Sequence, residues 1–181
     1  MLVRAFQTIK DVAATSSKKE KESLLKRGDS PYLRNLLVAT YDKFKTYRIL
    51  QIEQPGSYNS VQPDTMEEFM TLCKQLASHT LGTNEAKVRI RRFLATNTAE
   101  VAGMLTNLLL RDLRAGIDEK TCNRAFPGLI PVFGIQLGYA LDSWDRIKFP
   151  IVCDEKIDGI RCPGIYDGDS VRFYSRKGFL S

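Results

Sequence analysis

The sequence contains no long run of apolar residues. A membrane-spanning helix needs roughly 20 consecutive, mostly apolar residues, and no stretch of the 181 residues comes near that length. The N-terminus has the spacing of an amphipathic helix, with Leu2, Phe6, Ile9 and Ala13 on one face, and it lacks the apolar stretch of a signal peptide. We therefore expect a cytoplasmic protein that does not engage a membrane.

Cysteine and histidine are few and scattered. The four cysteines, at positions 73, 122, 153 and 162, form no Cys-x-x-Cys pair, and His79 is the single histidine. A disulfide framework or a zinc site needs such side chains at regular, paired spacing. We expect reduced, mostly buried thiols and no metal site made by residues of this chain.

Acidic residues are too few to balance the basic ones in the first part of the chain. Residues 1–128 hold 20 lysines and arginines against 14 aspartates and glutamates, whereas residues 129–181 hold 7 of each kind. The whole net charge of +6 therefore lies in the first part. This asymmetry favours an anionic partner, nucleic acid first of all, although a solvated basic surface without a ligand explains the charge equally well.

Residues 1–128 have the apolar periodicity of successive helices, separated by local start and stop signals. The predicted helix starts are Ser16 or Ser17, Ser30 with Pro31, Asp64 with Glu67, Thr83, and Asn97 with Glu100. Asp64 and Asn97 have the spacing of capping boxes with their glutamates. The first of these helices is expected to stop at Gly28, and its charged run of residues 18–22 is interpreted as a solvated helix face, with DNA contact as the lesser alternative.

The pattern changes after residue 128. Residues 149–153, 159–166 and 171–175 are short β-type runs, and Asp167-Gly168 between the last two is a strong hairpin turn. So few strands cannot enclose a core of their own. The predicted fold is an all-α N-terminal domain over residues 1–128, followed over residues 129–181 by the first β-strands of an α+β domain that is truncated.

The most specific motif is Lys156-Ile-Asp158-Gly159-Ile-Arg161, which follows the first predicted strand. It fits Lys-x-Asp-Gly-x-Arg, and a chance match in a chain of this length has odds on the order of one in a few hundred. The motif resembles the nucleophile signature of the covalent nucleotidyltransferases, which include DNA ligases, RNA ligases and mRNA capping enzymes. The alternative is a charge-rich surface hairpin.

This resemblance implies a chemistry for the motif. Lys156 would attack the α-phosphate of ATP, release pyrophosphate and carry AMP, which requires a neutral amine although free lysine has a pKa of about 10.4. Bound Mg²⁺ and basic side chains such as Arg161 would lower that pKa by disfavouring the ammonium. The Mg²⁺ ligands are expected mostly outside this chain. Asp154 and Glu155 precede the lysine, and the resemblance leaves open which of the two lies beside the adenine.

Ser175-Arg176-Lys177-Gly178 resembles the Ser-Arg-x-Gly segment found one hairpin beyond the lysine in these ligases. The resemblance implies that Arg176 reaches the nucleotide phosphates or the nicked strand, a role suited to a forked guanidinium. The family's later elements, including a glutamate for ribose and metal and an OB-fold domain, are not among these residues. We therefore expect the 181 residues alone not to seal DNA.

The third motif lies in the helical part, over residues 110–131, and resembles the Arg-Asp-Leu-Arg-x-Gly segment of ligase DNA-binding domains. One helix is expected to end at Gly116 and another to begin with Asp118 as its cap, which brings basic side chains and free backbone N–H groups to one corner. Such a corner can grip phosphates across a minor groove. The residues predicted to contact DNA are Arg111, Arg114, Gly116, Lys120 and Arg124.

Together, the three motifs resemble the ATP-dependent DNA ligases of the T-even-phage type. The resemblance implies an enzyme of DNA replication, repair and recombination that works as a monomer on nicked duplex DNA in the cytoplasm of a bacterial host. A sliding clamp is a further candidate partner. Two alternatives remain from the sequence: an RNA ligase or capping-type nucleotidyltransferase, and a non-catalytic DNA-binding module.

Overall fold

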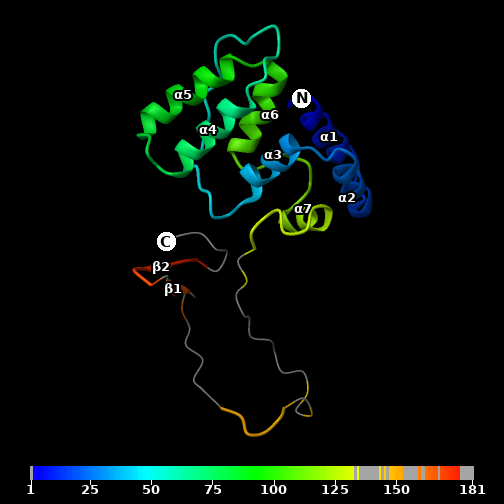
Figure 1. The fold of residues 1–181 in the computed structure, drawn as a ribbon, viewed down its shortest axis with the longest axis vertical. Helices are drawn as coiled ribbons and strands as arrows, with labels where there is room; N and C mark the ends of the chain where they lie inside the picture. The colour runs from blue at the N-terminus through cyan, green and yellow to red at the C-terminus, as the bar shows by residue number, and fades with distance from the viewer. Residues whose placement is uncertain are drawn as a thin grey trace. The chain divides into compact units, whose positions relative to one another are not determined.

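The structure, a computed structural model, describes residues 2–132, 134, 143, 145, 147–152, 159, 162–166 and 168–175. The chain divides into two compact units, Met1–Pro131 and Val132–Ser181. The first is helical, and the described part of the second contains a small antiparallel sheet (Figure 1). The coarse fold prediction, helices followed by β structure, is therefore confirmed. The assignment of a DNA-binding domain and a nucleotidyltransferase domain to either side of residue 128 stays a prediction.

Three helices begin at side-chain caps that the sequence predicts. The helices are α1 (Leu2–Ala14), α2 (Lys18–Arg27), α3 (Pro31–Tyr41), α4 (Met66–Ala77), α5 (Thr83–Ala95), α6 (Ala99–Leu109) and α7 (Glu119–Ala125). Ser17 caps α2, Ser30 caps α3 and Asp118 caps α7, each accepting a hydrogen bond from a backbone N–H three residues later. α2 ends at Gly28, as expected.

The other predicted caps are wrong by one residue. α4, α5 and α6 follow Thr65, Gly82 and Thr98, and none of these three caps makes a side-chain hydrogen bond. Tertiary contacts explain the difference at Asn97, which is fully buried. Its amide donates to the Phe93 carbonyl at 2.8 Å and accepts from the Thr65 hydroxyl at 2.7 Å, so it joins two helix ends instead of capping one.

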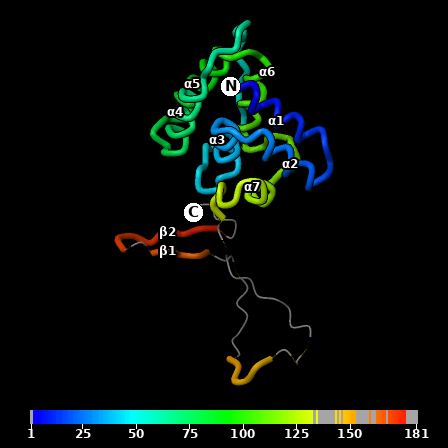
Figure 2. Tube along the Cα trace, turned by 45° about the vertical axis from the view of Figure 1, so that its right-hand side comes forward, coloured from blue at the N-terminus to red at the C-terminus, as the bar shows by residue number. Residues whose placement is uncertain are grey.

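The core of the first unit forms where α3 meets α1, α4 and α6. The largest side chains with almost no exposed surface are Phe6, Phe69, Leu2, Ile9, Leu25, Leu33, Leu36, Leu37, Leu94, Leu105, Leu108 and Leu109. Figures 1 and 2 also show α2 beside α7, two helices far apart in the sequence that contact each other. Among the described residues, no helix has both the length and the apolar character required to span a membrane.

The described part of the second unit contains one hairpin. β1 (Gly164–Tyr166) pairs antiparallel with β2 (Val171–Phe173), so the predicted hairpin is confirmed in shorter form. Residues 149–152 were expected to be part of a strand, but they form none. A strand exists only through hydrogen bonds to a neighbour, and these four residues pair with no other described residue.

Candidate nucleic-acid interface

The loop of residues 110–118 joins α6 to α7 through an unusual backbone. Arg111, Arg114 and Gly116 have φ angles of 64°, 52° and 58°, in the left-handed region that only glycine adopts freely. The Asp112 carboxylate accepts a hydrogen bond from the Arg114 N–H at 2.8 Å. Two non-glycine residues held at positive φ store local strain, so neighbouring structure must hold this loop in place.

Arg111 turns its guanidinium into the protein. It donates to the backbone carbonyls of Asp42 and Lys45, the former at 2.8 Å, and lies 6.0 Å from the centre of the Tyr47 ring. Burial lowers the pKa of Arg111. Arg111 thus fastens the loop to the turn after α3, while its predicted contact with DNA stays untested.

Lys21 holds the other side of the same loop. Only 7% of its surface is exposed, and its Nζ donates to the carbonyls of Ala115 at 2.7 Å and Gly116 at 3.0 Å. The interpretation of residues 18–22 as a solvated face is therefore wrong for Lys21, although Lys18 and Lys19 are exposed. The signal that sequence reasoning missed is spacing, because Lys21 lies four residues before the buried Leu25 and shares its helix face.

The start of α7 is fixed by local and distant contacts. Asp118 accepts from the Thr121 N–H at 2.9 Å; partial burial opposes ionisation, but this hydrogen bond and the Thr121 hydroxyl lower the pKa of Asp118. Glu119 forms an ion pair with Lys43 at 2.8 Å, and the hydrogen bond from Lys43 lowers the pKa of Glu119. α7 is therefore attached to the turn after α3 as well as to α2.

The exposed side of this corner carries three basic side chains, together with the Asp112 and Asp118 carboxylates, which accept hydrogen bonds from backbone N–H groups. Arg114, Gly116, Lys120 and Arg124 are exposed, and Arg124 makes an ion pair with Glu22 of α2 at 3.3 Å. Arg114 and Lys120 form no ion pair with any residue that the structure describes. The structure thus leaves four of the five predicted DNA-contact residues exposed on the loop and α7, and turns the fifth, Arg111, inward.

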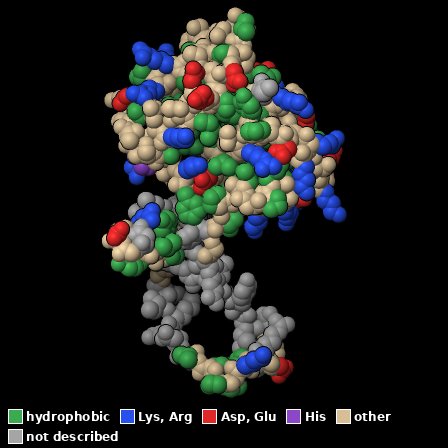
Figure 3. Space-filling model, in the orientation of Figure 1, with side chains coloured by type: hydrophobic (Ala, Val, Ile, Leu, Met, Phe, Trp, Pro, Cys, Tyr) green, Lys and Arg blue, Asp and Glu red, His purple; other side chains and the backbone are tan. Residues whose placement is uncertain are grey.

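The charge of the helical unit is unevenly distributed. Figure 3 shows lysine and arginine side chains along the α2 side of the helical unit, whereas acidic and basic side chains lie together over α4 and α5. The exposed cations of α2 are Lys18, Lys19, Lys26 and Arg27. Since α2 packs against α7, these cations extend the basic surface of the loop corner.

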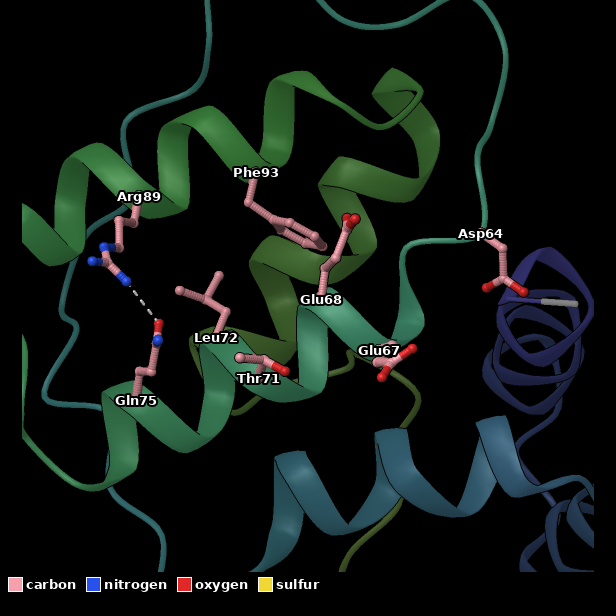
Figure 4. Close-up of a pocket in the computed structure, with 8 residues that line it drawn as sticks. All are labelled: Asp64, Glu67, Glu68, Thr71, Leu72, Gln75, Arg89 and Phe93. Carbon is pink, nitrogen blue, oxygen red and sulfur yellow. Dashed lines mark hydrogen bonds between the residues drawn. The ribbon is translucent and has the colours of Figure 1, made fainter.

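An acidic pocket marks the α4–α5 side. It has a volume of about 490 Å³, and its lining residues are Asp64, Glu67, Glu68, Thr71, Leu72, Gln75, Arg89 and Phe93. Figure 4 shows Arg89 of α5 hydrogen-bonded across it to Gln75 of α4, at 3.0 Å. Three carboxylates against one guanidinium would repel a phosphate, so this pocket does not belong to the basic surface.

The predicted nucleotide-binding residues lie outside the described residues. They are Asp154, Glu155, Lys156, Arg161 and Arg176. Their roles therefore remain as the sequence predicts them. Within the described ranges, no group of three or more His, Cys, Asp or Glu side chains could hold a metal ion.

Known proteins with a similar sequence are DNA ligases of bacteriophages. No protein-family model matches the chain. Two DNA ligases, from Enterobacteria phage T4 and Enterobacteria phage T6, are each 28% identical to it over 184 aligned residues, which cover 96% of the chain. The resemblance to the DNA ligases of T-even phages is confirmed. The chain spans 37% of the length of these two ligases.

Two solved structures share the fold of this ligase-like chain. They are named Pmar-Lig_PreS3 and Pmar-Lig_Pre, and each superposes with a TM-score of 0.75 at 24% sequence identity. The superposition covers 97% of this chain in both cases, and 43% and 42% of the two solved chains. The arrangement of helices described above is therefore one that experimental structures also contain.

Proposed function

We propose that the chain is part of an ATP-dependent DNA ligase and that its helical unit binds nicked duplex DNA. The similarity to phage DNA ligases over 96% of the chain carries this proposal. The binding surface is the basic corner, defined as residues 110–124 together with the exposed face of α2. The geometry of this corner supports a role in contacting the DNA backbone.

The basic corner suits phosphates rather than bases. Arg114 and Lys120 are exposed cations on either side of the left-handed turn at Gly116. Cations and backbone N–H groups contact phosphate oxygens, which all sequences share. A ligase must act at any nick, and a backbone-reading surface meets that need. Such binding weakens as salt rises, because each phosphate contact releases counterions.

The second unit is proposed to be the first part of the nucleotidyltransferase domain. In the chain, the β1–β2 hairpin lies between Lys156 and Arg176, which is the spacing that the ligase resemblance leads us to expect. The Lys156 amine would form a bond to the α-phosphorus of ATP as the bond to pyrophosphate breaks, after losing its proton. Mg²⁺ would offset the charge of the departing pyrophosphate. The AMP on Lys156 would then activate the 5′-phosphate at the nick.

The cellular setting follows from the same proposal. We infer a monomer that acts in the cytoplasm of a bacterial host during DNA replication, repair or recombination, with a sliding clamp as a further candidate partner. A ligase needs one nick and one nucleotide, so a single copy of the enzyme suffices.

The test measures DNA binding by variants of the 181-residue chain in which the charge of exposed side chains is reversed. These side chains do not hold the fold together. Arg114→Glu with Lys120→Glu should weaken binding to all nicked duplexes alike and lower the slope of log affinity against log salt by about 2, because each lost phosphate contact lowers that slope by about 1. Arg111 is unsuitable for this purpose because it holds the turn after α3. The matched control is Lys87→Glu with Arg91→Glu, the same charge change on exposed positions of α5. Fluorescence anisotropy at several salt concentrations measures both.

Three results would contradict the proposal. The first is equal weakening by the α5 control, which would mean that net charge rather than the basic corner determines binding. Tight binding that ignores salt would exclude phosphate contacts. Preference for a nicked RNA duplex over a nicked DNA duplex would favour an RNA ligase.

A further inference from the structure

Lys21 is a buried cation whose partners are backbone carbonyls. It lies on α2 and, among the described residues, forms no ion pair. Its two hydrogen bonds go to Ala115 and Gly116, 94 and 95 residues further along the chain. Burying an ammonium costs free energy unless it is well hydrogen-bonded. An apolar side chain could pack α2 against the loop without that cost, so the placement of Lys21 calls for a role beyond packing.

The two carbonyl contacts determine where the next N–H groups point. A trans peptide unit is planar, and its C=O and N–H point in opposite directions. The one cis bond found in the described residues, Phe149–Pro150, lies outside this loop. By holding the carbonyls of Ala115 and Gly116, Lys21 turns the N–H groups of Gly116 and Ile117 away from α2.

In the chain, these two N–H groups lie between the exposed cations Arg114 and Lys120, with the capping residue Asp118 directly after them. Gly116 is exposed and Ile117 half-buried, and neither N–H donates to another described residue. Arg114 precedes the pair and Lys120 follows it. Successive N–H groups that point outward from a turn with a left-handed residue form a concavity that binds an anion.

We propose that Lys21 is a positioning residue for DNA binding. It does not touch the DNA, and it holds the Gly116 and Ile117 N–H groups toward one phosphate of the backbone. This inference rests on the proposed function, since it assigns a residue behind the same basic corner. The lack of a side chain at Gly116 leaves room for Lys21, because a Cβ at this position would lie 2.7 Å from the Lys21 Nζ and displace it.

The experiment compares Lys21→Met with Lys87→Met in the 181-residue chain. Both substitutions remove one positive charge, but Lys87 is exposed on α5, outside the basic corner. Affinity for a fluorescent nicked duplex is measured over a salt series. Lys21→Met should bind about tenfold more weakly than Lys87→Met, the loss expected when charge-assisted hydrogen bonds no longer hold the corner. Equal affinity of the two variants overturns the inference.

A double-mutant cycle separates positioning from a general effect on charge. If Lys21 acts through the corner, Arg114→Ala should weaken binding less in the Lys21→Met background than in the native chain. Additive losses would mean that Lys21 and Arg114 act independently, which overturns the positioning role. A change in global stability alone leaves the affinity of the folded chain unchanged.

Folding is checked by circular dichroism and thermal unfolding of each variant. If Lys21→Met does not fold, Lys21→Gln replaces it, because its shorter side chain keeps a neutral donor but cannot reach both carbonyls. Native affinity of folded Lys21→Gln overturns the inference. Absence of DNA binding by the native chain would instead overturn the proposed function, whereas native binding with an unaffected Lys21 variant overturns only the positioning role.

Discussion

The two units differ in where their apolar side chains lie. The helical unit buries residues such as Leu36 and Phe69 completely. In the second unit, every residue of β1 and β2 is exposed, and Phe173 keeps 52% of its surface in solvent. Helices satisfy their own backbone and can pack on one another at once, whereas a two-stranded hairpin needs further strands or a helix to cover a face. The helical unit therefore completes its own core, and the described hairpin does not.

The largest expected effect is the loss of adenylation without loss of DNA binding, which would assign the two activities to different units. In the complete ligase, Lys156→Arg should abolish adenylation, because a guanidinium does not deprotonate near neutral pH. DNA binding by the helical unit should be unchanged. Intact-mass and peptide mass spectrometry after incubation with ATP and Mg²⁺ measure AMP, with Lys177→Arg as the matched control. AMP on Lys148 or Lys177 with Lys156 unmodified would refute the assignment.

The difference in burial predicts that replacing a phenylalanine costs much more stability in the helical unit than in the hairpin. Phe69→Ala should lower the free energy of unfolding by about 3–5 kcal/mol, because it removes a buried ring and leaves a cavity. Phe173→Ala should lower it by less than about 1 kcal/mol, since about half of that residue's surface is already in water. Urea unfolding of the 181-residue chain measures both. Equal costs would show that the hairpin contributes a core of its own.

Within the helical unit, Arg111 and Arg114 should have opposite roles. Arg111→Met should destabilise the fold by about 1.5–3 kcal/mol, because the carbonyls of Asp42 and Lys45 lose a charged donor. Arg114→Met should leave stability nearly unchanged and weaken DNA binding. Urea unfolding and anisotropy on both variants test the distinction. A stable Arg111→Met that fails to bind DNA would reassign Arg111 to the interface.

The smallest effect concerns pH. The pKa of Glu119 is lowered in the folded protein by Lys43, so this ion pair contributes stability above the ordinary glutamate pKa of about 4.3. That contribution is lost as the pH falls through the lower folded-state value. Glu119→Gln should therefore flatten the fall in stability between about pH 5 and 3. Glu85→Gln, which removes an exposed ion pair with Arg89, serves as the control; an equal change there would exclude a special role for Glu119.

Sequence reasoning succeeded where one local contact decides the structure. Ser30 and Asp118 begin helices because their side chains reach an N–H only three residues away. The hairpin of residues 164–173 was predicted from its turn for the same reason. Prediction failed at Asn97, where partners 4 and 32 residues away compete for the amide that was expected to cap a helix.

The candidate interface was predicted in part. Gly116 and its basic neighbours were found because the motif places them within a few residues. Motif matching cannot tell which arginine faces solvent, so Arg111 and Arg114 were treated alike. Lys21 was missed because a charged run on a helix is usually solvated. Its spacing to Leu25 indicated burial, but nothing near it in the sequence indicated the carbonyls it meets.

The sequence by itself determined the starts of α2, α3 and α7, the hairpin turn, the charge asymmetry and the motifs that resemble a ligase, because each depends on residues close together in the chain. Only the tertiary structure decided the direction of the buried Lys21 and the half-buried Arg111. The carbonyls that hold Lys21 and Arg111 lie 94 and 66 residues away in the chain. A buried charge takes its place from the partners that folding brings to it, and those partners leave no local pattern to read.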